Sequence, residues 1–526
     1  MDALQEDFNA DEGYVPPFQK KYFSGEIMAR YEPLVNAMEA VEEARGTDDE
    51  VWREFDKHWE IFMNFSWCGN WAETKFDIIF YGVSGYSGYL LMEYLKRYTL
   101  NQQETGGLNI AFAGTNASRV AEMRDRVFQG TPWASAAILV ASAEDVVSVI
   151  DLVKSARIIV NAAGPYMLTE GEVIVDACIW CKTDYVDLSQ ELPWSLRLKD
   201  LHRYAVEAGV MCVVGAASNA YADLGVYLLA KRLKERFGEV TRQAVSYCQS
   251  GGGARAGISH EMLRTRAALE DVDAKTQEEM KDPYALGGFV PHFDRNGVKV
   301  VDVQMGTGVV TPNIRKEDRD SVLAEISEDP RLLVWRAPYD GAKLDTRVVR
   351  RSNMLQADLA NEPYGTTFNF TEFVRLPAQE IATARSLMQQ GSLSESDTFT
   401  MAGTLQSAEQ AELESAGLVY QDGEGPAIEV MQQWNAFFLA AFTAAGNEAR
   451  CSFVTNDGYF ESARMAVEMS IALLLDRAKL PFRGGVLTPS AAGGTALVDR
   501  LLRSGITFSS DSWIQDMARP RLPGQT

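Results

Sequence analysis

The chain has 526 residues and a mass of 58.2 kDa, which predicts two or three domains, each with its own core. Hydrophobic residues make up 46% and charged residues 23%, a composition that excludes a fibrous or disordered protein. The 73 acidic residues outnumber the 50 Lys and Arg, so the net charge of -23 argues against nucleic acid as a partner. A phosphorylated ligand must then be held by local groups, such as the amides at a helix N-terminus.

Cysteine usage and the first residues of the chain indicate the compartment. The 6 cysteines are too few and too scattered for a disulfide framework, which favours a reducing environment. The N-terminus is acidic where a transit peptide would be rich in arginine, and no apolar stretch reaches the roughly 18 to 20 residues that span a bilayer. We therefore expect an intracellular, soluble, cytoplasmic protein without a transmembrane segment.

Residues 1–74 form an acidic, aromatic N-terminal extension. Aromatic side chains such as Trp52, Phe55 and Trp59 recur there at helical spacing, which favours packing on the body of the protein.

From residue 75 onward, short apolar runs alternate with amphipathic helices, the pattern of a parallel sheet with crossover helices. Six strands are predicted, at residues 77–81, 108–113, 138–141, 157–162, 184–188 and 210–215. Capping-box spacings at Ser142 with Asp145 and at Thr169 with Glu172 predict two helix starts. The sequence thus predicts an α/β fold: a Rossmann-type doubly wound parallel sheet with an NAD(P)-binding loop over residues 75–225.

A second, α+β domain is predicted for residues 226–483, as the site of the substrate and of a dimer interface. Strands are predicted at residues 298–304, 367–374 and 450–455. Trp434, Phe438 and Phe442 recur at helical spacing before Gly446, which predicts a helix with a glycine stop. Residues 484–526 are expected to form a C-terminal helix and a tail that pack back on the body.

The sharpest motif is the glycine-rich loop after the first strand, Gly82-Val83-Ser84-Gly85-Tyr86-Ser87-Gly88. In such loops the first glycine permits a tight turn, the second lets a pyrophosphate approach the backbone, and the third allows close packing of helix on strand. A purely structural glycine turn is the alternative. The predicted cofactor contacts are Gly82, Ser84, Gly85, Tyr86, Ser87 and Gly88.

The end of the second strand indicates which dinucleotide is bound. NAD sites usually place an Asp or Glu there for the ribose hydroxyls, but this chain has Thr115, Asn116 and Arg119. These side chains can donate to a 2'-phosphate, so NADP is favoured over NAD as the cofactor. The alternative for Arg119 is a solvated residue in the first turn of a helix.

The fourth strand leads into the turn Asn161-Ala162-Ala163-Gly164-Pro165-Tyr166, at the carboxyl edge where open α/β sheets bind ligands. Ala163, Gly164 and Pro165 are predicted to face the nicotinamide half of the cofactor, although Gly and Pro also suit a turn that only shapes the loop. No metal site is predicted, since Cys178 and Cys181 fall within an amphipathic helix and the 4 histidines are widely spread.

Further motifs follow in order, at residues 185–189, 222–225, 250–253, 282–284, 335–339, 346–352 and 484–489. Together with the glycine loop and the turn after the fourth strand, they resemble the saccharopine dehydrogenase-like oxidoreductases, which include trans-acting enoyl reductases. The resemblance spans about residues 76–508. It implies an NADP-dependent oxidoreductase that transfers hydride to a C=C or C=N bond, often of a lipidic substrate. Lipid droplets and mitochondria are locations that the resemblance adds.

One segment, Ala217-Ser218-Asn219-Ala220-Tyr221, departs from the family pattern, which has an aspartate there. The chain is then either a reductase with another proton donor or a cofactor-binding pseudoenzyme at a lipid droplet or membrane, with the apolar stretch 437–442 as the contact. A reductase needs a donor within hydrogen-bond reach of the developing charge. Tyr166 and Tyr221 are the candidates, with Tyr284 as a third, and packing against the cofactor is the alternative role for each.

Substrate recognition is less defined. Arg347, Arg350 and Arg351 form the one arginine cluster that could bind a substrate carboxylate, and a structural role is the alternative. Saccharopine itself is therefore not the expected substrate, and a homodimer is compatible with the sequence.

Overall fold

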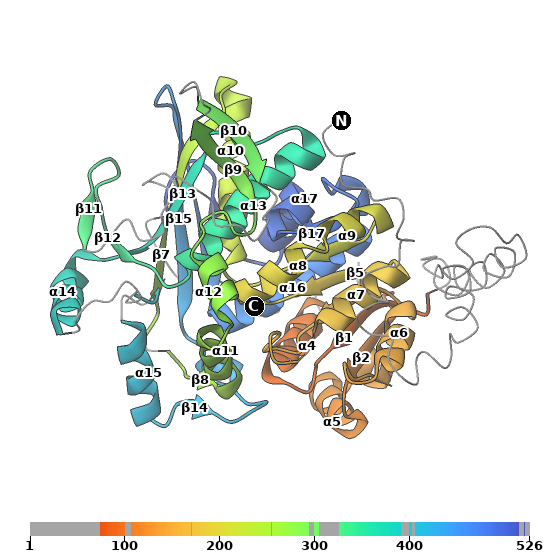
Figure 1. Cartoon of the computed structure of the whole chain (residues 1–526). Coiled ribbons are helices and arrows are strands. Elements are labelled where there is room, and N and C mark those ends of the chain that lie inside the picture. Colours follow the sequence, from red (N-terminus) through yellow and green to blue (C-terminus); the bar gives the residue numbers. More distant parts are fainter. Residues whose placement is uncertain are drawn as a thin grey trace, which may run out of the picture.

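The structure is a computed structural model that describes residues 74–99, 107–169, 171–253, 255–293, 299–304, 326–390, 399–401, 405–514 and 520. Two seven-stranded sheets organise these residues, and they lie side by side with helices between and around them (Figure 1). The predicted N-terminal extension, residues 1–74, lies outside the described residues except for residue 74.

The first sheet is parallel and has the strand order β17-β6-β5-β4-β1-β2-β3. Its strands are β1 (Phe76–Tyr81), β2 (Ile110–Gly114), β3 (Ala137–Val140), β4 (Ala156–Asn161), β5 (Asp184–Asp187), β6 (Met211–Val213) and β17 (Gly485–Leu487). The helices that alternate with them are α4 (Tyr86–Thr99), α5 (Ala117–Phe128), α6 (Val146–Lys154), α7 (Glu172–Cys181), α8 (Leu192–Lys199) and α9 (His202–Ala208). This order confirms the predicted Rossmann-type doubly wound sheet. The seventh strand, β17, comes from the far end of the chain and was not among the six predicted strands.

The predicted capping boxes are wrong, although both helices exist. The N-cap of α6 is Asp145, whose side chain accepts from the amide of Ser148. The N-cap of α7 is Gly171, and the Thr169 hydroxyl donates instead to the carbonyl of Ala163 at 2.8 Å. Each serine or threonine therefore belongs to the loop before its helix.

The second sheet is mixed, with the order β11-β12-β13-β7-β15-β16-β18. Its strands are β7 (Thr241–Gly251), β11 (Ser327–Asp329), β12 (Val334–Pro338), β13 (Asn369–Arg375), β15 (Trp434–Thr443), β16 (Glu448–Asn456) and β18 (Thr507–Ser509). Two short two-stranded sheets pair β9 (Gly288–Phe293) with β10 (Lys299–Gln304), and β8 (Ile258–Ser259) with β14 (Val419–Tyr420). The α+β class predicted for this half is confirmed.

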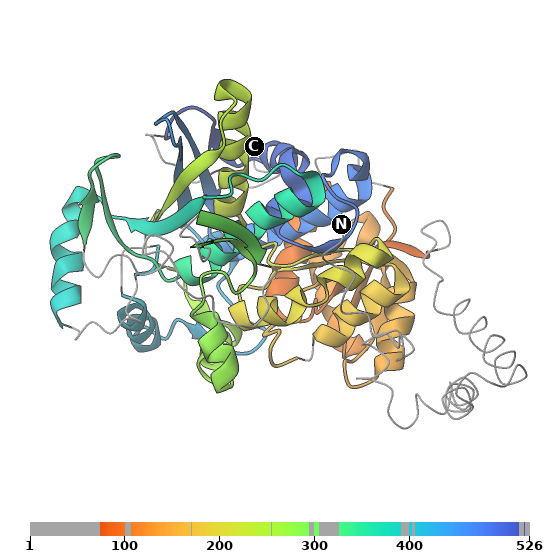
Figure 2. The ribbon, with the colours of Figure 1, turned by 45° about the horizontal axis from the view of Figure 1, so that its top comes forward.

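Helices join the two sheets. They are α10 (Ala220–Phe237), α13 (Ala342–Ala360), α16 (Gly458–Leu475) and α17 (Pro489–Arg503). Helix α10 packs on β15, α13 and α17, while α16 packs on α4 and α17. Helix α17 also packs on α13 and β6, so it contacts both halves, and Figure 2 shows the orange and yellow helices of the Rossmann half gathered on one side of the molecule. The remaining helices, α11 (His260–Glu270), α12 (Ala274–Met280), α14 (Ile381–Gln390) and α15 (Gln406–Ser415), lie around the second half.

The helix predicted around Trp434 to Gly446 is a strand, so this prediction is wrong. Nearly all residues of β15 are buried, because the strand lies inside the sheet between β7 and β16 and is covered on both faces. A strand buried on both faces has apolar residues at nearly every position, including those spaced as in a helix. Phe437 and Phe442 are 0% and 3% exposed. The stretch considered as a membrane contact is therefore part of the core.

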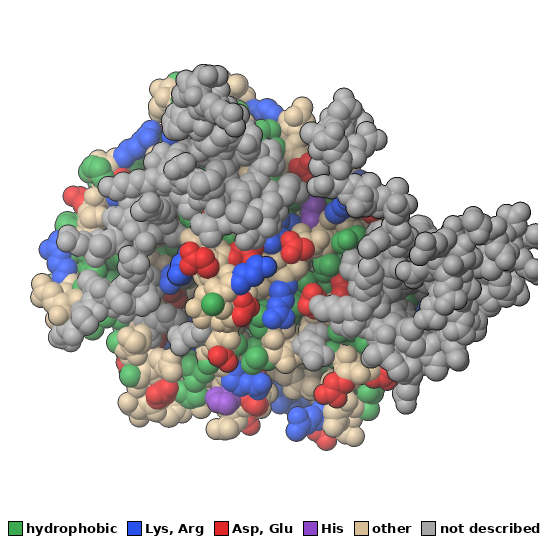
Figure 3. All heavy atoms as spheres, viewed as in Figure 1, with side chains coloured by type: hydrophobic (Ala, Val, Ile, Leu, Met, Phe, Trp, Pro, Cys, Tyr) green, Lys and Arg blue, Asp and Glu red, His purple; other side chains and the backbone are tan. Residues whose placement is uncertain are grey.

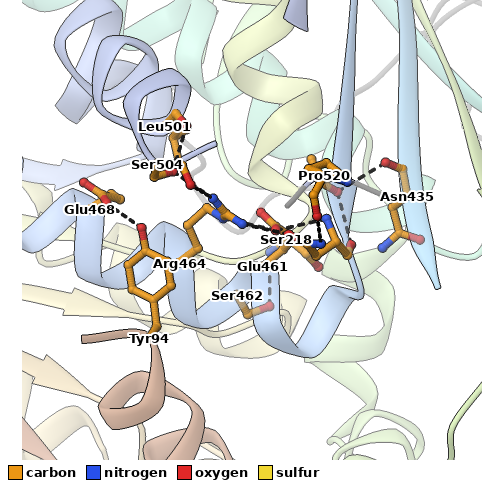
Figure 4. Close-up of polar contacts among 12 residues, drawn as sticks. Tyr94, Ser218, Asn435, Glu461, Ser462, Arg464, Glu468, Leu501, Ser504 and Pro520 are labelled. Carbon is orange, nitrogen blue, oxygen red and sulfur yellow. Dashed lines mark hydrogen bonds and ion pairs between the residues drawn. The ribbon is translucent and has the colours of Figure 1, made fainter. Parts of the chain in front are cut away.

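A buried polar network ties α16 to the Rossmann half (Figure 4). Arg464 pairs with Glu461 at 3.1 Å and donates to Asn456 at 2.7 Å and to the Ser504 hydroxyl at 2.9 Å. One helical turn on, Glu468 accepts from the Tyr94 hydroxyl of α4 at 2.5 Å. Because buried charges are costly without partners, this network fixes how the two halves meet.

The surface shown in Figure 3 interleaves acidic and basic side chains. The large apolar side chains that are exposed, such as Val140, Leu333 and Val430, are far apart in the chain. Among the helices of the described residues, none combines the length and the apolar content needed to cross a bilayer.

Candidate active site

The glycine loop lies at the point where the strand order reverses, between β1 and its neighbour β4. Gly82 has φ +83°, and a Cβ there would lie 2.6 Å from the amide of Ala163. A Cβ on Gly88 would lie 2.4 Å from the Gly82 carbonyl and from Val83 Cα. Both positions therefore require glycine for packing reasons alone, because real Cβ contacts are never this short.

Gly85 is different. A Cβ there would meet only the Gly82 carbonyl, at 3.5 Å, and the residue is partly exposed. The space over Gly85 is therefore open, and it lies at the N-terminus of α4, where backbone amides point outward. Packing does not require glycine at this position.

Two other loop residues contact neighbouring segments. The backbone of Ser84 faces a segment of the second half, since a Cβ on Gly423 would lie 3.7 Å from the Ser84 carbonyl. Tyr86 is buried, and its hydroxyl donates to the Pro426 carbonyl at 2.8 Å. Ser87 is exposed. Residues 423–426 thus lie against the glycine loop and form one wall beside it.

The end of β2 carries the predicted 2'-phosphate donors. Thr115, Asn116, Ser118 and Arg119 are all exposed. The Asn116 side chain caps α5 by accepting from the amide of Arg119 at 3.1 Å. Among the described residues, no ion-pair partner holds the Arg119 guanidinium. The Ser84 hydroxyl lies near this strand end, 3.7 Å from where a Cβ on Gly114 would be, so the loop and the donors are adjacent.

The turn after β4 is held by its own side chains. The Asn161 side chain accepts from the amide of Ala163 at 3.0 Å, and Gly164-Pro165 is a cis peptide. The Glu191 carboxylate accepts from the amides of Tyr166 and Met167 at 2.9 and 3.0 Å. The turn is thereby fixed beside Gly82.

Tyr166, the first predicted proton donor, is 5% exposed. Its hydroxyl donates to the Asn161 carbonyl at 2.8 Å and accepts from the amide of Leu188 at 3.2 Å, while its ring stacks on Trp194 at 5.5 Å. Burial, with Asp187 nearby, raises the pKa of the Tyr166 hydroxyl well above its ordinary value. The hydroxyl thus bridges the ends of β4 and β5.

Asp187 organises the end of β5. Its carboxylate accepts from the amide and hydroxyl of Ser189, the amide of Gly215, the Trp194 indole and the Tyr185 hydroxyl, at 2.7 to 3.1 Å. Burial raises the pKa of Asp187, and these hydrogen bonds oppose that shift. This explains the motif at residues 185–189: the aspartate joins the carboxyl ends of β5 and β6.

A small pocket lies at this edge, beyond β5 and β6, with room inside for little more than a water molecule. It is lined by Ser189, Ser195, Val214, Gly215, Asn219, Ala220, Asp223, Leu344, Asp345, Val348 and Pro489. The pocket thus joins the Rossmann edge to the N-terminal turns of α10, α13 and α17. Asp223 accepts from the Ser352 hydroxyl and the Ser490 amide at 2.5 and 2.9 Å, and burial raises the pKa of Asp223 to about 6.

The other two tyrosines lie away from this pocket's lining. Tyr221 is fully buried, and its hydroxyl donates to Glu461 at 2.9 Å within the network that joins the halves. Its ring packs against Phe437 and Phe453. Tyr284 is 2% exposed, with the Arg350 guanidinium 5.4 Å from its ring centroid.

The arginine cluster binds backbone. Arg347 donates to the carbonyls of Met280 and Asp282 at 2.8 and 2.9 Å, and Arg350 donates to the carbonyl of Pro283 at 3.1 Å. Arg351 donates to the carbonyls of Leu286 and Val486 at 2.9 and 2.8 Å. The three guanidinium groups thus anchor the 280–286 segment and β17. This is the structural role that the sequence left open as the alternative to binding a substrate carboxylate.

Sequence reasoning missed two carboxyl groups, Asp345 in the lining of the pocket and Glu372 next to Asp345. Asp345 did not stand out in the sequence, because acidic residues are common in the first turn of a helix. Glu372 offered a signal, because it stands inside the apolar strand β13, and an acid is rarely buried without a reason.

Comparisons with known proteins identify relatives of this chain by sequence. No family model matches the chain. The trans-acting enoyl reductase of Mycobacterium tuberculosis H37Rv is 28% identical over 463 residues, which cover 84% of this chain and 98% of that protein. A second protein of that strain, provisionally described as a trans-acting enoyl reductase, is 30% identical over 448 residues, which cover 83% of this chain and 97% of that protein.

Two solved structures show a partial likeness. Apo saccharopine dehydrogenase (L-Glu forming) from Saccharomyces cerevisiae is 13% identical with a TM-score of 0.41, and the match covers 83% of this chain and all of that one (100%). Homospermidine synthase from Legionella pneumophila, in complex with NAD, is 8% identical with a TM-score of 0.39, covering 84% and 92% of the two chains.

The Rossmann sheet, the glycine loop at its switch point and the sequence relatives define the class of protein: an NAD(P)-dependent oxidoreductase. The chain belongs to the family of the trans-acting enoyl reductases. The family expected from the sequence is thereby confirmed.

Proposed function

We propose that this chain is an NADP-dependent reductase that reduces the C=C bond of an enoyl substrate of lipidic type. The observation that carries the proposal is the open space over Gly85, at the switch point of the sheet and at the N-terminus of α4. A single Cβ would fill part of that space, yet no packing contact requires its absence. The close approach of a pyrophosphate to the backbone would explain why this position is a glycine.

The cofactor fits the residues around this opening. The first-turn amides of α4, with Ser84 and Ser87, would hold the pyrophosphate, and the exposed donors Thr115 and Arg119 would hold the 2'-phosphate. A guanidinium group can bind a phosphate with two parallel hydrogen bonds and with its charge, whereas an uncharged ribose hydroxyl offers no charge to pair with. This favours NADP over NAD.

The substrate half of the site would be the pocket beyond β5 and β6. Four of the residues that line it, Val214, Ala220, Leu344 and Val348, are apolar, which suits an acyl chain better than a charged amino acid. The arginines that could hold a substrate carboxylate are occupied by backbone carbonyls. The enoyl chemistry itself rests on the names of the relatives, which are enoyl reductases.

Within this site, Ala163, Gly164 and Pro165 would shape the surface against which the nicotinamide lies. When bound, the nicotinamide supplies a hydride. Tyr166 and Asn161 would hold the turn in place, since their hydrogen bonds are made inside the protein. Tyr221 would serve the contact between the two halves.

Titration of the purified chain with NADPH and with NADH tests the proposal, followed by cofactor fluorescence and thermal unfolding. A ligand at about 100 times its Kd should stabilise the native state by about 2.7 kcal/mol. We expect NADPH to bind more tightly, and NADPH to be oxidised when a 2-enoyl thioester is added. Binding of neither dinucleotide would refute the cofactor site, and binding without turnover of enoyl or imine probes would refute the reductase.

A further inference from the structure

Two carboxyl groups from different elements meet at the wall of the proposed substrate pocket. Asp345 lies in the first turn of α13, lines the pocket and is 2% exposed. Glu372 lies on β13 behind it and is also 2% exposed. The Asn219 side-chain amide, also at the pocket, donates to Asp345 Oδ1 at 2.6 Å, and the Cys248 thiol donates to Glu372 Oε1 at 3.0 Å.

The second oxygen of each carboxyl group has no donor. Asp345 Oδ2 and Glu372 Oε2 are buried without a hydrogen-bond partner, although the two groups lie within hydrogen-bonding reach of each other. Two carboxylates in this position would repel, and two oxygen acceptors cannot bond to each other. One proton between them removes both problems, because a carboxylic acid donates to a carboxylate.

The charges around the pair favour a retained proton on Asp345. Burial and then the charge of Glu372 raise the pKa of Asp345 well above its ordinary value. The pKa of Glu372 is raised by burial, while the hydrogen bonds from Cys248 and Asp345 oppose that shift. Among the described residues, no Lys or Arg forms an ion pair with either carboxyl group.

Other titratable groups also face the pair. They are Tyr339 and Asp340 in the turn before α13, Cys248 on β7, and Asp223 on α10 across the pocket. The Arg266 guanidinium lowers the pKa of Asp340 and so opposes the effect of burial on that carboxyl group. The charges that act on Asp345 itself are those of the acids Glu372 and Asp340, which make loss of the Asp345 proton harder.

We propose that Asp345, which lines the pocket, is the catalytic proton donor of this site and that Glu372 is the positioning residue that keeps Asp345 protonated between turnovers, with Asn219 holding the Asp345 carboxyl group at the pocket wall. The inference rests on the proposed reductase function. It assigns the donor to residues that neither the family motifs nor the tyrosine candidates include.

The chemistry balances. Hydride addition at one carbon of the C=C bond breaks its π bond, and the electron pair moves toward the conjugated carbonyl. The O–H bond of Asp345 then breaks, and a C–H bond forms at the second carbon. The substrate gains a hydride and a proton and is reduced by two electrons, which the cofactor loses. The Asp345 carboxylate then regains a proton from water that enters the pocket it lines.

The test compares Asp345→Asn and Glu372→Gln with wild type, and uses Glu468→Gln as a matched control. Glu468 is fully buried and its pKa is raised to about 7, but it lies in the network between α4 and α16 and not at the pocket. The probes are NADPH and a short-chain 2-enoyl thioester. Thermal unfolding and NADPH affinity are measured for every variant.

Asp345→Asn should lower kcat by about 100-fold or more, the usual size of a general-acid contribution, with NADPH affinity within about twofold of wild type. Wild-type kcat should fall at high pH, as Asp345 ionises. Glu372→Gln should move that fall to lower pH, because the negative charge that raises the Asp345 pKa is gone. A merely structural Glu372 would leave the position of the fall unchanged.

A second readout does not depend on turnover. Glu468, with its pKa raised to about 7, adds a protonated-carboxyl band of its own at neutral pH, so the readout is the difference spectrum of wild type minus Asp345→Asn. That difference should contain a protonated-carboxyl band that shifts in D₂O, and the same band should be lost when Asp345→Asn is introduced into Glu468→Gln. The proposal is overturned if the difference spectrum lacks that band, or if an active wild type and Asp345→Asn have kcat values within about tenfold of each other. A wild type that binds NADPH but reduces no enoyl probe would instead overturn the proposed function, and the donor role with it.

Discussion

Gly85 offers the sharpest test of the cofactor site. Packing explains why positions 82 and 88 must be glycine, but it does not explain the glycine at position 85. In Gly85→Ala the new Cβ would meet only the Gly82 carbonyl, at an ordinary contact distance of 3.5 Å. Replacing a glycine by alanine in a backbone conformation that alanine can adopt changes the free energy of unfolding by about 0.4–1 kcal/mol in the stabilising direction. Thermal unfolding of Gly85→Ala and Gly85→Val without ligand should therefore stay close to wild type.

Cofactor binding should respond quite differently. A methyl group over the loop holds the pyrophosphate away from the α4 amides, and a valine side chain does so further. Losing one hydrogen bond to a charged group costs about 1.5–3 kcal/mol, which is roughly 10- to 100-fold in Kd. Titration of NADPH by fluorescence should show this loss for Gly85→Ala and a larger one for Gly85→Val.

Gly88→Ala is the matched control. Its Cβ would lie 2.4 Å from the Gly82 carbonyl and from Val83 Cα, so this variant should lose about 1–3 kcal/mol of stability through overpacking. Wild-type NADPH affinity in Gly85→Val would refute the assignment of this opening to the pyrophosphate. A large loss of stability in ligand-free Gly85→Ala would refute the argument that the space is empty.

Three further outcomes follow from the structure. Arg119→Ala should weaken NADPH binding by roughly 10-fold and leave NADH binding within about twofold, and equal losses for both would exclude a 2'-phosphate contact. Tyr166→Phe should lower the free energy of unfolding by about 1–3 kcal/mol, because the Leu188 amide loses its buried acceptor. The fall of kcat at high pH should remain in this variant, and its disappearance would identify Tyr166 as the proton donor. Burial and then Arg351 lower the pKa of His202 from 6.5 to about 4, so the unfolded chain binds a proton in this window that the folded chain does not. The free energy of unfolding should therefore be highest above pH 6.5 and fall by up to about 3 kcal/mol toward pH 4. Chemical unfolding of His202→Asn should show a weaker dependence on pH, and an unchanged dependence would contradict this role of His202.

Predictions from local pattern were accurate where burial and period agree. Six of the seven strands of the Rossmann sheet were placed to within about two residues, since each short apolar run lies between turn residues, and β17 was missed. β15 was mistaken for a helix because a strand covered on both faces has no alternation left to read. The two capping boxes failed for a related reason: the side chains of Ser142 and Thr169 bond within loops, and only the tertiary path of those loops decides this.

The sequence by itself determined the glycine loop, the dinucleotide fold and the family, because these depend on residues that are close together in the chain. The pairing of β17 with β6, the wall of residues 423–426 beside the loop, and the carboxyl pair of Asp345 and Glu372 were decided only by the tertiary structure. The physical reason is that a carboxyl group's charge and proton depend on what surrounds it in space. The groups around Asp345 are Asn219 at the N-cap of α10, Cys248 on β7 and Glu372 on β13, which lie 126, 97 and 27 residues from Asp345 in the chain.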